Sequence, residues 1–128
     1  MKNLLNWQDR DIVAIFDEVT LWSAPFGRLL FENIPMKAGA TVVDIGFGTG
    51  FPLIELSQRF GKRSRIIGVD IWEEAILLAN QKIERLEIDN IELLEASAAA
   101  IDIGDAEVDL VTSNLGVNNF EGKEQVYA

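Results

Sequence analysis

The chain has 128 residues, of which 48% are hydrophobic and 25% are charged, so we expect a single folded domain rather than a disordered chain. Its net charge of −10 argues against a nucleic-acid surface, because phosphate binding needs clustered lysine and arginine. The absence of cysteine and histidine removes disulfides, the usual metal ligands and the usual general base, so no metal site is predicted.

The N-terminal part reads as two short helices. The first is predicted over about residues 7–18, where apolar residues recur at helical spacing. Ser23 is a predicted N-cap with Pro25 in the first turn of the second helix, which Pro35 ends. Charged residues from Asp9 onward come too early for a signal peptide, and no apolar run approaches the roughly 20 residues of a membrane helix. We therefore expect a cytoplasmic protein without a membrane span.

From residue 41 the pattern alternates between strands and helices. The predicted strands are residues 41–45, 65–70, 90–95 and 108–113, and the predicted helices between them are about 52–60 and 73–86. Strands that are separated by helical crossovers indicate a parallel sheet with right-handed connections. Residues 41–120 are therefore predicted to form an α/β core.

A glycine-rich loop follows the first predicted strand, in the sequence Asp44-Ile45-Gly46-Phe47-Gly48-Thr49-Gly50. Backbone without Cβ atoms lets a ligand approach closely, and the next helix offers free N–H groups at its N-terminus. The dinucleotide pattern is G-x-G-x-x-G, whereas Phe51 stands here in place of its third glycine. The loop favours a nucleoside-bearing cofactor other than a nicotinamide dinucleotide. A glycine-rich turn without a ligand is the plain alternative.

Asp70 comes 20 residues after Gly50, at the end of the second predicted strand. A carboxylate at this point can accept hydrogen bonds from both ribose hydroxyls of an adenosine. The alternative is an N-cap for the following helix, which is a common role for aspartate. The glycine loop and Asp70 together are more specific than either feature alone.

These residues, with Gly68-Val69-Asp70-Ile71 and Val108-Asp109-Leu110-Val111-Thr112-Ser113-Asn114, resemble the class I S-adenosylmethionine-dependent methyltransferases. The resemblance covers roughly residues 35–120 and implies a Rossmann-like parallel sheet with helices on both faces. The implied strand order is 3-2-1-4, which gives four of the usual seven strands. It also implies that the loop passes under the methionine part of the cofactor, with Asp44 near its amino group. Asp70 would bind the ribose and Ile71 would lie against the adenine. The predicted cofactor-binding residues are Asp44, Gly46, Phe47, Gly48, Gly50, Asp70, Ile71, Ser97, Ala98 and Asn114.

Three departures from the family pattern matter. The turn after the third strand reads Ala96-Ser97-Ala98, where the family often has an acid for the adenine amino group. Ser97 offers one hydrogen bond there, and the later Gly104-Asp105-Ala106 is interpreted as a surface turn. The segment Asn114-Leu115-Gly116 lacks the two prolines of enzymes that methylate amino nitrogens of bases, so base methylation is not supported. Asn114 as a turn residue that caps the next helix is the alternative.

The third departure is length. Four strands leave the outer edge of the fourth strand without a partner, which is an association hazard. We therefore expect either a C-terminally truncated chain or a homodimer that forms through this edge. The single predicted domain, residues 1–128, would comprise a helical lid over residues 1–36 and the core over 41–120. Trp22, Ser23 and Phe26 are candidates to close on the cofactor, with plain core packing as the alternative.

The predicted function is methyl transfer from S-adenosylmethionine to a small-molecule acceptor. The sulfonium is already activated, so the protein need mainly align the two reactants. No catalytic base is assigned. A module or fragment that binds the cofactor without turnover is the alternative, and a nicotinamide oxidoreductase ranks last because of Phe51.

Overall fold

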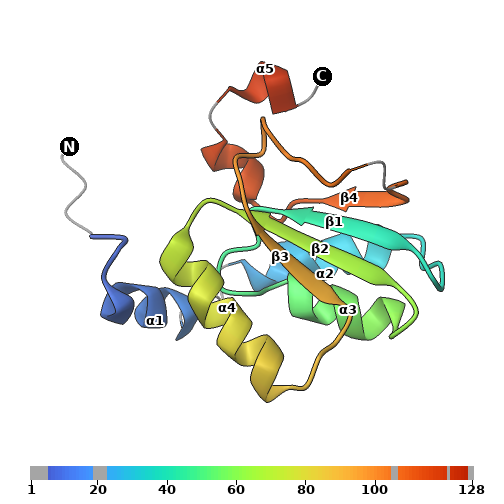
Figure 1. Cartoon of the computed structure of the whole chain (residues 1–128), viewed down its shortest axis with the longest axis horizontal. Coiled ribbons are helices and arrows are strands. Elements are labelled where there is room, and N and C mark those ends of the chain that lie inside the picture. The colour runs from blue at the N-terminus through green and yellow to red at the C-terminus, as the bar shows by residue number, and fades with distance from the viewer. Residues whose placement is uncertain (1–5, 19–22, 105–106, 121, 127–128) are drawn as a thin grey trace.

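The computed structural model describes residues 6–18, 23–104, 107–120 and 122–126. Four parallel strands form one sheet in the order β3-β2-β1-β4, which confirms the predicted order (Figure 1). The strands are β1 (Thr41–Ile45), β2 (Arg65–Asp70), β3 (Ile91–Glu95) and β4 (Leu110–Thr112). The helices are α1 (Arg10–Glu18), α2 (Ala24–Asn33), α3 (Leu53–Phe60), α4 (Glu73–Arg85), the 3₁₀ helix η2 (Gly116–Asn119) and α5 (Lys123–Val126).

The two central strands have the bounds that the sequence predicts, whereas the outer two are shorter. β1 pairs with β2 from Thr41 opposite Arg65 to Ile45 opposite Val69. β4 begins at Leu110 instead of residue 108. The carboxylate of the preceding residue, Asp109, accepts hydrogen bonds from Lys37 Nζ (2.6 Å) and from the backbone N–H of Thr41 (2.9 Å). These bonds hold the chain beside β1 before the ladder begins.

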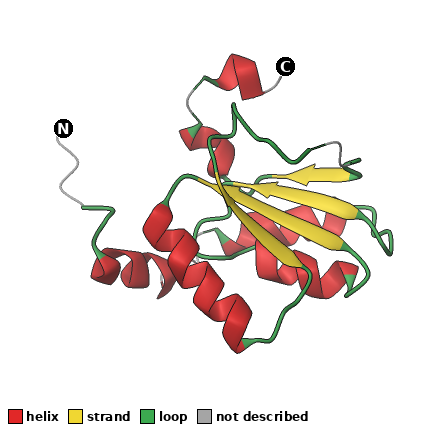
Figure 2. Ribbon diagram, in the orientation of Figure 1, coloured by secondary structure: helices red, strands yellow, loops and turns green. Residues whose placement is uncertain are grey.

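One face of the sheet is covered by helices α2, α3 and α4 (Figure 2). Val42 and Ile66 point to this face and pack in one cluster with Leu53 and Leu56 of α3. Gly68 allows the close approach, because a Cβ at this position would lie 2.7 Å from Leu53 Cδ2. Successive side chains of β1 and β2 point to opposite faces, so each strand has one helix-covered side, and both strands are buried continuously along their middle residues.

The opposite face is covered by residues 96–104 and 107–109. Val43, Ile67 and Val69 of the sheet pack there against a set of partly buried residues that includes Ile101 and Ile103. The described residues of this segment contain no helix, whereas the resemblance implies helices on both faces. A turn interrupts the segment at Gly104, whose φ is +67° and whose N–H donates to the Asp102 carboxylate at 3.1 Å.

The two N-terminal helices are both present. α1 begins at Arg10 and not at residue 7, because Asp9 caps it: its carboxylate accepts from Asp11 N–H at 2.9 Å. Ser23 occupies the N-cap position of α2 as predicted, but its side chain makes no capping hydrogen bond. Within the described ranges, every helix is too short or too polar to cross a membrane.

The packing of α3 on the sheet gives a first prediction. Leu56→Ala should lower the free energy of unfolding by about 2–5 kcal/mol, because Leu56 is fully buried and the change leaves a cavity. The same substitution at Leu29, which is 56% exposed on α2, should cost less than about 1 kcal/mol. Urea unfolding followed by circular dichroism measures both variants. Equal losses of unfolding free energy in the two variants would contradict the role of Leu56 in the core.

Candidate functional site

The glycine loop lies at the carboxyl end of β1, where it turns sharply into α3. Gly46, Gly48 and Gly50 have φ values of +76°, +57° and +118°, which residues with a Cβ rarely adopt. Between them the side chains of Phe47 and Thr49 are buried, at 1% and 3% exposure. The predicted contact of Phe47 with a cofactor therefore concerns its backbone, because its ring belongs to the core beneath the loop.

The loop has no room for a Cβ at one glycine, whereas a Cβ would fit at another. A Cβ at Gly46 would lie 2.9 Å from Gly116 Cα, so the chain after β4 contacts the loop at this point. At Gly48 the nearest neighbour of such a Cβ would be Phe16 Cε1, at 4.0 Å. A Cβ would therefore clash at Gly46, whereas at Gly48 it would only reach ordinary van der Waals contact with Phe16.

Asp70, at the end of β2, is bonded to this loop through its side chain. One carboxylate oxygen, Oδ2, accepts from Gly48 N–H at 2.7 Å. The other, Oδ1, accepts from the N–H groups of Ile71 (2.7 Å) and Trp72 (3.0 Å). The N-cap residue of α4 is Trp72, so Asp70 binds the loop and the chain before the helix instead of capping its first turn. Next to it, the side chain of Ile71 is 67% exposed.

Asp44 is fully buried in the middle of the sheet. It lies in one row with Gly68 of β2 and Thr112 of β4, which are its partners in the two neighbouring strands. Thr112 Oγ1 donates to Asp44 Oδ1 at 2.8 Å. Asp44 Oδ2 is buried without a hydrogen-bond partner among the described residues. Burial raises the pKa of Asp44 to about 7; the Thr112 hydrogen bond lowers this pKa and the charge of Asp70 raises it further.

These observations bear on whether the residues fit the cofactor that the resemblance implies. Asp44 Oδ2 lacks a hydrogen-bond partner among the described residues, and the Asp70 carboxylate is bonded to the loop at Gly48. A ligand that carries ribose hydroxyls and an ammonium group supplies hydrogen-bond donors of this kind. The donor and acceptor chemistry at the carboxyl ends of β1 and β2 therefore fits S-adenosylmethionine.

The remaining predicted residues lie after β3 and β4. Ser97 is exposed and its hydroxyl accepts from Ala99 N–H at 3.3 Å, while the neighbouring Ala98 is partly buried. Asn114 is partly buried, and its side-chain amide contacts the carbonyl oxygen of Ser23 at 3.5 Å. Asn114 does not cap η2. The N-cap residue of η2 is Leu115, which makes no side-chain capping hydrogen bond. The hydroxyl of Ser113 accepts from the N–H of Val117 (3.1 Å) and donates to the carbonyl oxygen of Ile45 (2.8 Å).

Among the described residues, an aromatic cluster that the sequence does not single out lies beside the loop. Trp22 lies outside the described residues, as do the last two residues of Gly104-Asp105-Ala106. Phe26 is 50% exposed, and Ser23 is buried. Instead, the rings of Trp7, Phe16 and Trp72 meet edge to face, with centroids 5.2–6.3 Å apart. Phe16 brings this cluster next to Gly48.

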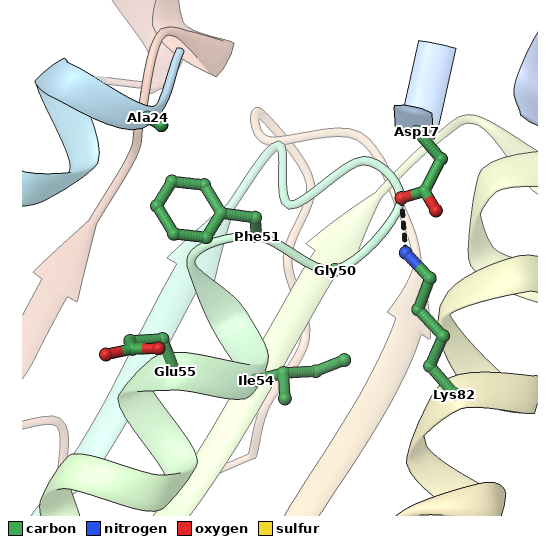
Figure 3. Close-up of a pocket in the computed structure, with 7 residues that line it drawn as sticks. All are labelled: Asp17, Ala24, Gly50, Phe51, Ile54, Glu55 and Lys82. Carbon is green, nitrogen blue, oxygen red and sulfur yellow. Dashed lines mark hydrogen bonds and ion pairs between the residues drawn. The ribbon is translucent and has the colours of Figure 1, made fainter. Parts of the chain in front are cut away.

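Sequence reasoning also missed Lys82 on α4. Its ammonium group donates to the carbonyl oxygen of Thr49 at 2.8 Å and pairs with Asp17 of α1 (Figure 3). A signal was present, because Ala75, Ala79 and Ile83 mark the buried side of α4 and Lys82 lies next to that side. A lysine at the margin of a buried helix face needs an anionic or carbonyl partner.

A pocket of about 250 Å³ lies on the helical side of the loop (Figure 3). Its lining residues are Asp17, Ala24, Gly50, Phe51, Ile54, Glu55 and Lys82. Of the predicted cofactor-binding residues, only Gly50 reaches it. Phe51 also closes the gap to α2, where a Cβ at Gly27 would lie 2.4 Å from Phe51 Cε1. Across the described ranges, acidic residues form no group of three or more that could hold a metal ion.

Comparison with known proteins identifies similar chains. A family model described as a methyltransferase domain matches residues 36–128. An arsenite methyltransferase of Halobacterium salinarum is 32% identical over 92 residues, which are 72% of this chain and 24% of that protein. A demethylmenaquinone methyltransferase of Bacillus cereus is 30% identical over 84 residues, which are 66% of this chain and 35% of that protein. The chain thus spans well under half the length of these relatives.

Solved structures share the fold. An S-adenosylmethionine-dependent methyltransferase from Aquifex aeolicus aligns with a TM-score of 0.69 and 27% identity, over 82% of this chain and 56% of that one. A Methanococcus maripaludis protein assigned to the same enzyme class aligns with a TM-score of 0.79 over 99% of this chain and 59% of that one. Its identity of 22% supports the fold alone.

The buried carboxyl of Asp44 gives a second prediction. Between its ordinary pKa of 3.8 and its raised pKa of about 7, the folded chain keeps a proton that the unfolded chain has lost. The free energy of unfolding should therefore fall as pH rises through this window, by about 4 kcal/mol in total. Asp44→Asn removes this loss and should be more stable than the unaltered chain at pH 8, with the difference shrinking toward pH 4.

Urea unfolding at each pH measures the two curves, and only their difference matters because all other groups titrate in both chains. Asp89→Asn makes the same chemical change at an exposed position and should leave the curve of the unaltered chain in place. Parallel curves for the unaltered chain and Asp44→Asn from pH 4 to 8 would contradict a raised pKa for Asp44.

Proposed function

This chain belongs to the family of methyltransferase domains, and on that premise we propose that it binds S-adenosylmethionine and transfers the methyl group to a small-molecule acceptor. The observation that carries the proposal is the Asp70 carboxylate at the end of β2, which accepts a hydrogen bond from the Gly48 amide of the glycine loop. The named substrates of two relatives, arsenite and demethylmenaquinone, support an acceptor of small size.

Binding of the cofactor would use residues from four strand ends. Asp70 would accept from the ribose hydroxyls, and the exposed side chain of Ile71 would lie against the adenine. Ser97 would offer one hydrogen bond to the adenine edge with Ala98 beside it. The methionine part would lie along the loop, with Asp44 near its amino group. The predicted loop contacts are Gly46, Phe47, Gly48 and Gly50, and Asn114 completes the set after β4.

The cofactor, when bound, supplies a sulfonium whose methyl group is already activated for transfer. The chain's own residues would then bind and align the reactants and exclude water. The aromatic cluster of Trp7, Phe16 and Trp72 lies beside Gly48 and is placed to shield the nucleoside side of the site. The helical lid that we propose is therefore built on α1, whose Phe16 carries the contact. No described residue is assigned as a catalytic base.

Asp70 gives a third prediction. The unaltered chain should bind S-adenosylhomocysteine in a calorimetric titration, and Asp70→Asn should bind it about 10–100-fold more weakly. The expected loss corresponds to hydrogen bonds with a charged acceptor, about 1.5–3 kcal/mol. Asp89→Asn, at an exposed position away from the loop, should bind as the unaltered chain does. Equal affinities for all three chains would leave Asp70 a structural residue only.

The same titration separates the competing functions. Binding of S-adenosylhomocysteine followed by turnover with arsenite, a quinol or another small acceptor supports the enzyme. Binding without turnover of any acceptor favours a module that only holds the cofactor. Binding of NADH in place of S-adenosylhomocysteine would favour the nicotinamide oxidoreductase, and binding of neither would contradict all three.

We also propose that the chain forms a homodimer through the outer edge of β4 and does not bind nucleic acid. In the described residues β4 pairs on one side only, with β1, and its Val111 is 59% exposed. Light scattering should therefore give a dimer mass, which Val111→Lys shifts toward the monomer while Leu29→Lys on α2 does not. A monodisperse monomer of the unaltered chain would contradict edge pairing.

A further inference from the structure

A continuous line of hydrogen bonds runs through the glycine loop from Lys82 to Asp70. Lys82 Nζ donates to the carbonyl oxygen of Thr49 at 2.8 Å. The N–H of the same peptide unit belongs to Gly50, and it donates to the carbonyl oxygen of Phe47 at 3.1 Å. The N–H of that next peptide unit belongs to Gly48, and it donates to Asp70 Oδ2 at 2.7 Å. Two peptide units are thus fixed in series between α4 and β2.

Every bond in this line points the same way. The cationic ammonium group lies at the donor end and the carboxylate lies at the acceptor end, so the two peptide dipoles are aligned head to tail between opposite charges. Hydrogen bonds in such a series polarise one another, so each strengthens its neighbours. A change in the hydrogen bonds of Asp70 should therefore alter the strength of the hydrogen bond between Lys82 and Thr49, and the reverse should also hold.

The donor end of the line continues into α1. Lys82 pairs with Asp17 near the end of that helix, and the two side chains are only 30% and 28% exposed (Figure 3). An ion pair that is this far withdrawn from water is less screened than a surface pair. α1 also carries Phe16, the residue that lies over Gly48. The same helix therefore covers the loop and is tied to its peptide units through Lys82.

Two further contacts join α1 and the segment before it to the start of α4. The indole N–H of Trp72 donates to the carbonyl oxygen of Trp7 at 2.7 Å, and Arg10 pairs with Glu74 at 3.5 Å. Trp72 in turn follows Asp70 closely, and its backbone N–H bonds the Asp70 carboxylate. Asp70, which we expect to bind the ribose, is thus connected to α1 and the segment before it by two routes. One runs through the loop and Lys82, and the other runs through Trp72.

We propose that Lys82 is a positioning residue that couples ligand binding at Asp70 to the docking of α1 over Gly48. This inference rests on the proposed function, because the ligand at Asp70 is the nucleoside of that cofactor. Hydroxyl groups that donate to Asp70 change its bonds to the loop, and the aligned peptide units carry this change to Lys82 and Asp17. The ammonium group is required because it bonds both the loop carbonyl of Thr49 and Asp17 of α1.

Hydrogen–deuterium exchange with and without saturating S-adenosylhomocysteine tests the coupling, since it reports the opening of α1 separately from that of the loop. In the unaltered chain the ligand should slow exchange both in residues 10–18 and in residues 46–50. In Lys82→Met the ligand should still slow exchange in the loop, but the slowing in α1 should be lost. Affinity should fall about tenfold, as expected when a coupling is removed.

Companion variants separate coupling from a general loss of stability. Asp17→Asn keeps the Lys82 bond to Thr49, so it should lose the slowing in α1 while its affinity falls less than that of Lys82→Met. Lys82→Arg retains a cation and should restore part of the effect. Lys62→Met makes the same substitution at an exposed residue and should behave as the unaltered chain does. Exchange in α1 without ligand gives the baseline of each folded variant.

Two outcomes would overturn the proposal in different ways. If S-adenosylhomocysteine slows exchange in α1 of Lys82→Met as much as in the unaltered chain, the coupling is wrong and the proposed function stands. If the unaltered chain does not bind S-adenosylhomocysteine at all, the proposed function fails and the coupling fails with it. If Lys82→Met does not fold, the comparison of Asp17→Asn with the unaltered chain decides in the same way.

Discussion

The glycine loop keeps its shape because the Asp70 carboxylate accepts a hydrogen bond from Gly48 N–H where two neighbouring parallel strands end. Strand pairing alone does not fix the loop, because the ladder between β1 and β2 stops at Ile45 and Val69. A carboxylate that accepts three backbone N–H groups holds each donor in place. The position of the backbone at Gly48 therefore depends on the side chain of Asp70 in the next strand.

Much of the fold follows from local sequence. β1 and β2 have their predicted bounds because each is a β-branched run that ends at a turn, and α3 ends where predicted because Gly61 follows it with a positive φ. The described part of the segment between β3 and β4, residues 96–104 and 107–109, was harder to predict. Its apolar residues pack against Val43 and Ile67, which are distant in sequence, and this long-range contact rather than local propensity determines its course.

The same contrast between local sequence and long-range contacts applies to the residues of the candidate site. Motif spacing was enough to predict the loop and Asp70, because both belong to one strand–turn–helix–strand unit. The partner of Asp44 depends on the register between β1 and β4, so Thr112 becomes recognisable only when those strands are paired. The contact between Trp7 and Trp72 joins residues that are 65 positions apart, and no local pattern reports it. For Lys82 the sequence holds part of the information: its place beside the buried side of α4 follows from the helical pattern, but its partners Thr49 and Asp17 are distant in sequence.

Phe51 has a consequence beyond the choice of cofactor. The ring that stands in place of a dinucleotide glycine also fills the space left by the missing Cβ of Gly27, so positions 27 and 51 form a pair of complementary size. A larger residue at one position requires a smaller one at the other, and natural variants of this chain are expected to exchange the two together. Redesign toward a dinucleotide would therefore begin in α2: a glycine at position 51 opens a void between α2 and α3 that only a bulkier residue at position 27 refills.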